Sequence, residues 1–369
     1  MKKLGFGFMR LPLTDPEDRT SVDIELTKKM VDEYMSAGFE YFDTAWVYCG
    51  FNSENILRQA LVERYPRESF KIATKLHAGF INNTEERDAM FSEQLKKVGV
   101  DYFDYYLLHT IYTDFYKKYS DLDCFNWIIE KKRSGQVKNI GFSFHDTPEL
   151  LDEILTAHPE MDFVQLQINY LDWDSERIQS ENCYKVARRH GKNIIVMEPV
   201  KGGALANVPA DVEKMYKEIS PDMSIPSWAI RFAAGLEGVI MVLSGMSTID
   251  QVLDNTSYMK DFKPLSAEET DAVFKAARMI RNSIAVPCTG CEYCVDGCPK
   301  DIPIPSFFSL YNRDKKVDSR PSRDEYNELA EKLSPASACI ECGQCEAICP
   351  QKLSIIDDLK KVAKHFEKK

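Results

Sequence analysis

Short apolar runs alternate with amphipathic stretches from about residue 20 to residue 260 of the chain. Seven runs rich in β-branched and aromatic residues predict strands, and segments with helical periodicity predict helices between them. The predicted strands are 38–45, 70–76, 102–110, 137–144, 163–171, 193–200 and 239–246. The predicted helices include 23–38, 54–65, 84–99, 148–158 and 266–282. This alternation predicts repeated βα units around a parallel sheet.

The seven runs are one short of the eight strands that close a TIM barrel. We expect the segment 4–13, LGFGFMRLPL, to supply the eighth as a strand or a hairpin. The same alternation also fits an open, doubly wound sheet. The polar residues at the predicted strand ends favour the (β/α)8 barrel, which we assign to residues 1–282.

Length and composition change this picture in two ways. At 369 residues, the chain exceeds a barrel of roughly 250 residues by the size of a second, small module. No apolar run approaches the ~18 residues of a membrane span, and the start, MKKLGFGFMRLP, does not resemble a secretory signal. We therefore expect no membrane association and a cytoplasmic protein.

Charge argues against one class of partner. The net charge is −11, and no cluster of Lys and Arg interleaved with aromatic residues opposes the phosphate backbone that dominates nucleic-acid affinity. We therefore expect no nucleic-acid partner.

Eight of the eleven cysteines lie in two matching runs, CTGCEYCVDGCP (288–299) and CIECGQCEAICP (339–350). Each is a C-x2-C-x2-C-x3-C-P run, the bacterial ferredoxin signature, in which the fourth cysteine ligates the other cluster. Zinc is the alternative, but structural zinc sites use separate C-x2-C pairs. We therefore expect two [4Fe–4S] clusters, one on Cys288, Cys291, Cys294 and Cys349, and the other on Cys339, Cys342, Cys345 and Cys298.

The insert between the cysteine runs predicts the fold of this second domain. The stretches 305–316 and 322–333 have helical patterns, so residues 283–369 form a small, mainly helical ferredoxin-like domain in this interpretation. The scattered Cys49, Cys124 and Cys183 are expected to be small buried side chains. Clustered metal-binding cysteines are typical of a reducing cytoplasm.

Four residues capable of acid–base chemistry stand near the ends of successive predicted strands. Asp43 and Tyr48 lie at the end of the first, and Lys75 and His109 lie near the ends of the next two. In a barrel these ends form one face, where active sites are built. An ammonium beside a phenol favours ionisation of that phenol, whose unperturbed pKa is about 10. The sequence therefore predicts an acid–base site on this face.

These residues lie in motifs through which the sequence resembles the aldo/keto reductase family over roughly residues 1–282. The motifs are DTAWVY (43–48), FKIATKL (70–76), YYLLHT (105–110), IGFSFHD (140–146) and EPVKGG (198–203). The resemblance implies interconversion of a small carbonyl compound and an alcohol by nicotinamide hydride transfer. It implies that Tyr48 donates the proton, that Lys75 paired with Asp43 helps the phenol ionise, and that His109 orients the carbonyl.

The resemblance also implies the nucleotide contacts. Many family members have a tyrosine that stacks on the nicotinamide where this chain has Met197 or its neighbour Glu198. Gln251 replaces a basic residue that often binds the 2′-phosphate of NADP. We expect NADPH or NADH, with NADPH favoured. The implied contacts are Ser143 and Gln167 to the nicotinamide amide, with Ser244, Gly245, Ser247, Gln251 and Asn255 to the phosphates or adenine.

Two other functions stay open. The chain is an electron-transfer or nucleotide-sensing protein if its barrel turns over no carbonyl. It is a flavin-dependent redox enzyme if the surroundings of Met197 accommodate an isoalloxazine ring, although no flavin motif is evident. A hydride carries two electrons whereas each cluster passes one, so coupling the two domains needs two clusters acting together or an intermediate such as flavin. The clusters either exchange electrons with a ferredoxin or another redox partner, or only stiffen the C-terminal domain. We expect substrate choice to lie in loops such as 109–127.

Overall fold

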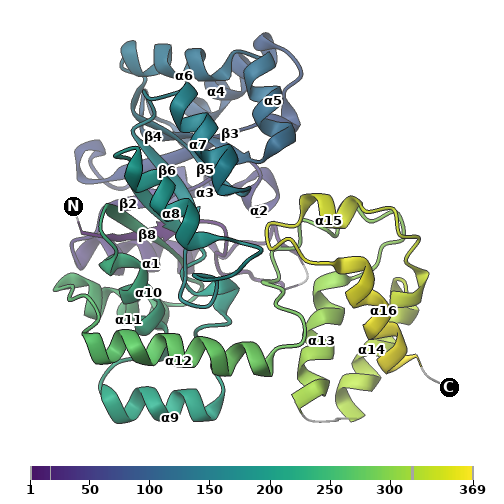
Figure 1. The fold of residues 1–369 in the computed structure, drawn as a ribbon. Coiled ribbons are helices and arrows are strands. Elements are labelled where there is room, and N and C mark those ends of the chain that lie inside the picture. Colours follow the sequence, from purple (N-terminus) through teal and green to yellow (C-terminus); the bar gives the residue numbers. More distant parts are fainter. Residues whose placement is uncertain (1, 17, 317–319, 368–369) are drawn as a thin grey trace. The chain divides into compact units, whose positions relative to one another are not determined.

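The structure is a computed structural model that describes residues 2–16, 18–316 and 320–367. Its first compact unit contains a closed barrel of eight parallel strands, in which each strand pairs with the next and β8 pairs with β1 (Figure 1). The closed barrel confirms the predicted fold class and excludes the open sheet. The strands are β1 (Leu4–Gly7), β2 (Tyr41–Asp43), β3 (Lys71–His77), β4 (Phe103–Ile111), β5 (Val137–Phe144), β6 (Phe163–Gln167), β7 (Asn193–Met197) and β8 (Val239–Gly245).

The segment 4–13 supplies the missing strand, as expected. Its strand β1 lies between β2 and β8 in the barrel. After β1 the chain forms an irregular loop, which is tied back by an isolated antiparallel bridge between Leu13 and Val22. Strand β6 ends at Gln167, four residues before the predicted end at residue 171.

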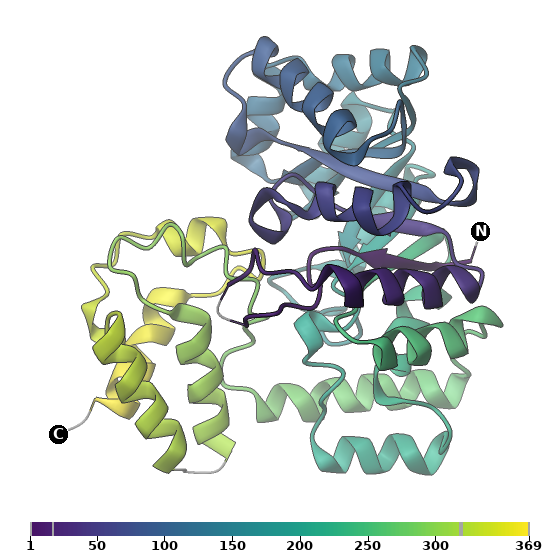
Figure 2. The ribbon, with the colours of Figure 1, turned by 180° about the vertical axis from the view of Figure 1, so that it is seen from behind.

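Helices cover the outside of the barrel, and helix α1 lies beside α11 (Figure 2). Asp23 caps α1 by accepting a hydrogen bond from the Leu26 amide, as the sequence pattern of helix starts suggests. The helices of this unit are α1 (Ile24–Ser36), α2 (Tyr48–Phe51), α3 (Ser53–Leu57), α4 (Thr84–Val98), α5 (Thr113–Asp121), α6 (Cys124–Arg133), α7 (Pro148–Ala157), α8 (Ser180–Arg189), α10 (Ile225–Gly235) and α11 (Ile249–Lys260).

Two predicted segments differ from the structure. The predicted helix 54–65 divides into α3 and a π-helical turn, Arg58–Val62. The segment 109–127, interpreted as a loop, is largely helical, because α5 and the first residues of α6 occupy it. Tyr119 explains the order of this segment, since its buried side chain accepts a hydrogen bond from the Ala78 amide and donates to the carbonyl oxygen of Leu76 or His109.

A cluster of buried side chains from six of the strands fills the barrel interior. On β5, a Cβ added at Gly141 would lie 2.4 Å from the backbone oxygen of Phe163, so only glycine fits there. The interior is therefore a packed core, and polar chemistry is confined to the strand ends. The cluster contains Tyr41, Ala73, Leu107, Phe163, Ile195, Met241 and Leu243.

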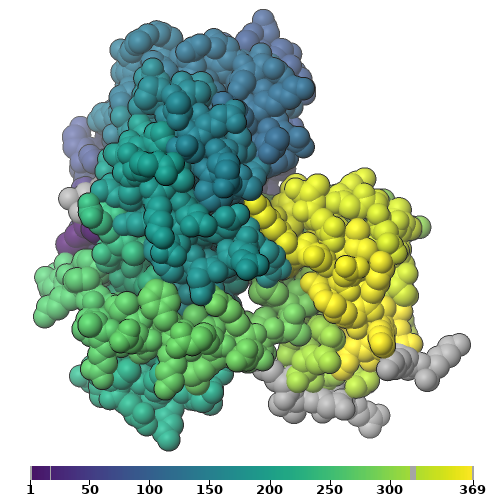
Figure 3. Space-filling model, viewed as in Figure 1, coloured from purple at the N-terminus to yellow at the C-terminus, as the bar shows by residue number. Residues whose placement is uncertain are grey.

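The second compact unit comprises residues 175–178, 200–225 and the chain from residue 271 onward. Phe307, Tyr326 and Phe366 are buried in its core, where the rings of Tyr326 and Phe366 stack with centroids 4.6 Å apart. Side chains of α16 form much of the face of this unit that is seen in Figure 3. Its helices are α9 (Ala210–Ile219), most of α12 (Ala267–Ser283), α13 (Ile304–Lys316), α14 (Arg320–Lys332), α15 (Gln344–Ile348) and α16 (Ile355–Phe366).

The mainly helical character expected for the cysteine-rich region is confirmed, since α13 and α14 match the predicted stretches 305–316 and 322–333. The two compact units are not separated by a single boundary in the sequence, because residues 200–225 pack with the cysteine-rich region. The domain bounds 1–282 and 283–369 stay a prediction. No helix within the described ranges is long and apolar enough to cross a membrane.

Candidate functional site

The four predicted acid–base residues come together at the carboxyl ends of β2, β3 and β4. The Lys75 ammonium donates hydrogen bonds to Asp43 Oδ1 at 2.6 Å and to the Thr44 carbonyl oxygen at 2.7 Å. Its Nζ lies 5.0 Å from the centre of the Tyr48 ring. The rings of Tyr48 and His109 have centroids 6.0 Å apart. Register in the sheet thus brings together side chains that are up to 66 residues apart in the chain, from 43 to 109.

The ion pair between Lys75 and Asp43 is buried, with side chains that are 0% and 5% exposed. Burial lowers the pKa of Lys75 and raises the pKa of Asp43, while the attraction between the two charges opposes both shifts. Removal of either partner would leave an uncompensated charge in a dry environment. The pair therefore holds an ammonium rigidly beside the half-buried phenol of Tyr48.

His109 presents a neutral imidazole to the same site. Burial, and then the neighbouring charges of His77 and Lys75, lower its pKa well below the usual value of histidine. Its Nδ1 atom is buried and has no hydrogen-bond partner among the described residues. Buried polar atoms are normally paired, so this nitrogen fits a role in binding a polar group of a ligand.

His77 is a site residue that the sequence analysis missed. It lies opposite His109 in the register of β3 and β4, and the two ring centroids are 5.1 Å apart. Burial lowers its pKa to about 4. The signal was present in the sequence, because alternate residues of a strand share a face and His77 follows Lys75 by two positions.

The backbone beside Tyr48 takes rare conformations. Cys49 and Phe51 have φ angles of 50° and 67°, in the left-handed region that non-glycine residues seldom adopt. Such strain is concentrated at functional sites in proteins, where the surrounding fold fixes it. This turn places Tyr48 immediately after the loop that follows β2.

The predicted nucleotide contacts lie at the ends of the remaining barrel strands. Ser143 is the second-last residue of β5. Its hydroxyl accepts a hydrogen bond from the Thr110 amide at 2.7 Å. Gln167 and Met197 are the last residues of β6 and β7 and are register partners. These three side chains thus share one edge of the barrel with the acid–base set.

A buried polar network that the sequence analysis missed surrounds Gln167. The Gln167 amide and the Asn169 amide each donate to Asp172 Oδ2 at 2.9 Å. Asn169 also donates to the Glu198 carbonyl oxygen, next to Met197. The prediction of a strand through residue 171 concealed this network, because β6 ends at Gln167 and residues 168–172 turn back towards the strand end.

The other predicted contacts lie where β8 leads into α11. Asn255 donates to the Ser244 hydroxyl at 3.0 Å, and Gln251 accepts from the Ser247 amide at 2.7 Å. A Cβ added at Gly245 would lie 3.4 Å from the Cβ of Arg10, so glycine lets the arginine stem pass closely. The amino end of α11 and this loop form the type of position that binds phosphates in barrels.

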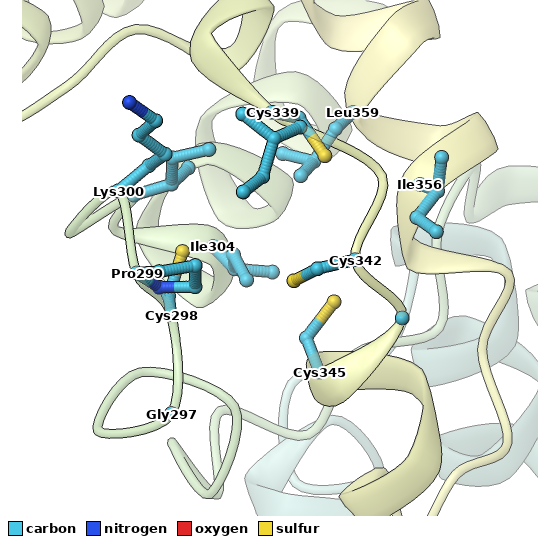
Figure 4. A pocket seen from close by; sticks show the side chains of 13 residues that line it. Gly297, Cys298, Pro299, Lys300, Ile304, Cys339, Cys342, Cys345, Ile356 and Leu359 are labelled. Carbon is cyan, nitrogen blue, oxygen red and sulfur yellow. The ribbon is translucent and has the colours of Figure 1, made fainter.

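The eight cysteines of the ferredoxin-like runs form two groups in the second unit. Cys288, Cys291, Cys294 and Cys349 line one cavity. A second cavity is lined by the remaining four cysteines, whose sulfur-bearing side chains surround it in Figure 4. The groups coincide with the two predicted ligand sets, each with its fourth cysteine from the other run. The second set is Cys298, Cys339, Cys342 and Cys345.

The donor set fits iron–sulfur clusters in its chemistry. All eight cysteines are free of disulfide bonds, and thiolates are the usual ligands of such clusters. Burial raises the pKa of the Cys288 and Cys345 thiols, the latter to about 11, so a positively charged group is needed to hold them as thiolates. No three His, Cys, Asp or Glu side chains within the described ranges are grouped to hold a single metal ion. Iron binding stays a prediction.

Lys201 is a further residue to which the sequence analysis gave no role, although it lies in the EPVKGG motif. Its side chain is buried, and Nζ donates to Gln351 Oε1 at 2.9 Å. Gln351 lines the cavity of the first cysteine set. The charge of Lys201 opposes the rise that burial causes in the pKa of Cys288.

The three scattered cysteines differ in burial. Cys124 and Cys183 are buried, whereas Cys49 is only half-buried. Burial raises the pKa of Cys49 to about 11 and that of Cys124 to about 12, so both are protonated thiols near neutral pH.

Both the barrel region and the cysteine-rich region of the chain match known protein families. A sequence model of the aldo/keto reductase family matches residues 3–278, and one of a 4Fe-4S dicluster domain matches residues 277–354. The uncharacterized oxidoreductase YqkF of Bacillus subtilis is 22% identical over 288 residues, which are 68% of this chain and 89% of that protein.

Solved structures share the barrel. The holo form of the aldo-keto reductase AKR11C1 from Bacillus halodurans has a TM-score of 0.60 and 24% identity, and the match covers 74% of this chain and 91% of that one. An aldo-keto reductase from Klebsiella pneumoniae in complex with NADPH has a TM-score of 0.58 and 15% identity, and the match covers 75% and 90%. At these identities the likeness shows the fold.

Proposed function

Because the chain belongs to the aldo/keto reductase family and carries a match to a 4Fe-4S dicluster domain, we propose that its barrel interconverts a small carbonyl compound and an alcohol by nicotinamide hydride transfer. Members of this family are oxidoreductases, and the chain is an enzyme of that type. The observation that carries the proposal is the buried Lys75 ammonium, held 2.6 Å from Asp43 and 5.0 Å from the centre of the Tyr48 ring.

Tyr48 is the acid–base residue in this proposal. In the direction of reduction, its hydroxyl donates a proton to the carbonyl oxygen, and the Lys75 ammonium stabilises the phenolate that remains. Asp43 fixes the ammonium in position through its carboxylate. The nicotinamide, when bound, supplies the hydride to the carbonyl carbon.

His109 orients the substrate. A neutral imidazole donates one hydrogen bond to the carbonyl oxygen without adding a second positive charge beside Lys75. Its lowered pKa keeps it neutral across the physiological pH range. The partner-free Nδ1 is a buried polar atom that a bound ligand would satisfy.

We assign the nucleotide to the part of the strand-end face formed by β5 to β8, beyond the strands β2 to β4 that carry Asp43, Lys75 and His109. Ser143 and Gln167 would hold the carboxamide of the nicotinamide, with Met197 against its ring. The loop from β8 to α11 would hold the phosphates and adenine through Ser244, Gly245, Ser247, Gln251 and Asn255. We favour NADPH over NADH, since Arg10 brings a basic side chain to this loop although Gln251 is uncharged.

The two cysteine sets would each hold one [4Fe–4S] cluster. When bound, such clusters accept and donate single electrons. The chain's own contribution is to supply four thiolates to each cavity and to surround them with the apolar side chains of Ile304, Phe308 and Leu359. We assign the exchange of these electrons to a ferredoxin or a similar redox partner, in a reducing cytoplasm.

The test is to replace Tyr48 with Phe. Loss of the phenolic proton should lower kcat for carbonyl reduction by about 10²- to 10⁴-fold, the usual contribution of general acid–base catalysis, and leave NADPH binding unchanged. Tyr184→Phe is the matched control, because Tyr184 donates its hydroxyl to the Glu237 carbonyl oxygen on the outside of the barrel. Turnover by Tyr48→Phe equal to that of Tyr184→Phe would refute the assignment.

A further inference from the structure

Lys201 lies in a short segment that packs against the first cysteine run within the second compact unit. Lys201 and Gly202 have φ angles of 47° and 61°. A Cβ added at Gly202 would lie 2.4 Å from the backbone oxygen of Thr289, which is the residue after Cys288. Glycine is therefore required for this approach of backbone to backbone. The approach fixes the position of Lys201 relative to the cysteine loop.

The Lys201 side chain is directed towards the same cysteine set. It is 4% exposed, and its ammonium donates to Gln351 Oε1 at 2.9 Å. Gln351 is itself 3% exposed, follows Cys349 by two residues and lines the cavity with all four cysteines of the first set. A buried positive charge is thus tied to the wall of one cysteine cavity.

The second cysteine cavity differs in this respect. The lysine that lines it is Lys300, which is exposed. Figure 4 shows its amine pointing away from the sulfur atoms of Cys298, Cys342 and Cys345. Water and salt screen an exposed charge much more than a buried one. The two cavities therefore have different electrostatic surroundings although their ligand runs match.

We propose that Lys201 raises the reduction potential of the cluster on Cys288, Cys291, Cys294 and Cys349 above that of the second cluster, an inference that rests on the proposed clusters. Reduction adds one electron to a cluster that four thiolates already make anionic. A cation in a poorly screened environment stabilises the added negative charge. A single electron supplied by dithionite therefore resides first on the cluster beside Lys201, and the second electron follows on the other cluster.

The experiment is a redox titration of full-length protein with dithionite, followed by electron paramagnetic resonance. Lys201→Met removes the charge and keeps most of the apolar stem. It should shift one of the two one-electron steps to a lower potential by at least tenfold in the reduction equilibrium, which is about 59 mV. The other step should stay in place. Lys300→Met is the matched control. It should shift the potential of neither one-electron step by as much as Lys201→Met shifts one of them.

Iron content is measured first, so that two failures are distinguishable. Wild-type protein without iron would refute the proposed clusters themselves. With eight irons expected for two such clusters, unchanged potentials in Lys201→Met would overturn only the role of Lys201. If Lys201→Met loads poorly, Lys201→Gln makes the same prediction, because it also removes the charge while it keeps a polar side chain. Equal shifts in the Lys201 and Lys300 variants would likewise overturn the proposal.

Discussion

The two candidate sites of this chain are assembled in different ways. In the barrel, Asp43, Lys75 and His109 come from three strands, and sheet register places them together. In the second unit, three of the four cysteines in each set come from one short run, and only the fourth comes from the other run. The first site depends on the whole barrel, whereas the second depends mainly on two local loops and the helices that hold them.

This difference has energetic consequences. The barrel site contains charged groups buried within a packed scaffold, so its stability and its chemistry are coupled through the Lys75–Asp43 pair. The cysteine sites gather mostly half-buried thiols whose charge as thiolates would be balanced by the bound iron, so their stability is coupled to loading. Substitutions in the barrel site can separate the stability of the fold from catalytic activity. Substitutions in the cysteine sites can separate iron loading from packing of the second unit. Both kinds test the comparison.

The largest expected effect concerns how the cysteine runs share their ligands. Cys298→Ala and Cys345→Ala should each remove the same cluster, so the double variant should keep about half of the wild-type iron. Cys298→Ala combined with Cys294→Ala should lose nearly all of it, because these cysteines belong to different sets. Iron per protein and cluster absorbance measure the result, and Cys183→Ala, at a buried barrel cysteine, is the control.

The opposite pattern would contradict the crossed ligand sets. If the Cys298 and Cys294 double variant kept half of the iron, each run would hold its own cluster. The grouping of Cys298 with Cys339, Cys342 and Cys345 around one cavity would then have no role in binding.

Lys75→Met should produce the next largest effect, on both stability and activity. It leaves the Asp43 carboxylate buried without its partner, which costs about 3–5 kcal/mol in the free energy of unfolding. It should also lower kcat by about 10²-fold or more, because the phenolate of Tyr48 loses its stabilising charge. Tryptophan fluorescence reports unfolding of the barrel unit, since all four tryptophans lie in it.

The double variant Lys75→Met with Asp43→Leu separates the two effects. An apolar pair of similar size should recover most of the stability, as buried ion pairs often can be replaced in this way. Activity should stay as low as in Lys75→Met. Recovery of turnover together with stability would show that the ammonium serves the fold and not the chemistry.

A smaller effect is expected from His77, whose pKa is lowered to about 4 by burial. Between pH 6.5 and 4, the unfolded chain binds a proton at this residue and the folded chain does not. The free energy of unfolding therefore falls with decreasing pH in this window, by at most about 1.4 kcal/mol per pH unit for one histidine. His77→Gln should flatten the decline of barrel stability between pH 7 and pH 5.

The wild-type protein is the reference for this pH dependence. Tryptophan fluorescence during denaturant unfolding at both pH values gives the comparison. An unchanged slope in His77→Gln would mean that other groups cause the acid sensitivity of the barrel.

The sequence predicted the parts of the molecule that local patterns encode. Spacing alone gave the two cysteine sets, and the strand ends with Asp43, Lys75 and His109 were visible because polar residues interrupt apolar runs. The position of His77, two residues after Lys75 on the same strand face, could have been recognised in the sequence, but its place opposite His109 depends on the register between β3 and β4. Lys201 escaped notice because its partner, Gln351, is 150 residues away in the chain.

Prediction also failed where side chains override local pattern. The segment 109–127 was interpreted as a loop, yet α5 forms there, and Tyr119 reaches back from it to backbone groups beside β3 and β4. The predicted strand through residue 171 ends early because Asn169 and Asp172 hydrogen-bond to each other, and Asp172 also accepts from the Gln167 amide. Such tertiary hydrogen bonds leave no periodic signal in the sequence.

The most direct test of the central claim follows the hydride itself. NADPH carrying deuterium at the transferable position is oxidised anaerobically by the wild-type enzyme with a panel of small aldehydes and ketones. The proposed function predicts deuterium on the carbinol carbon of the alcohol, and its loss in Tyr48→Phe. Deuterium that appears instead in solvent water while the clusters become reduced would contradict the proposal, because the electrons would then pass to iron and not to a carbonyl carbon.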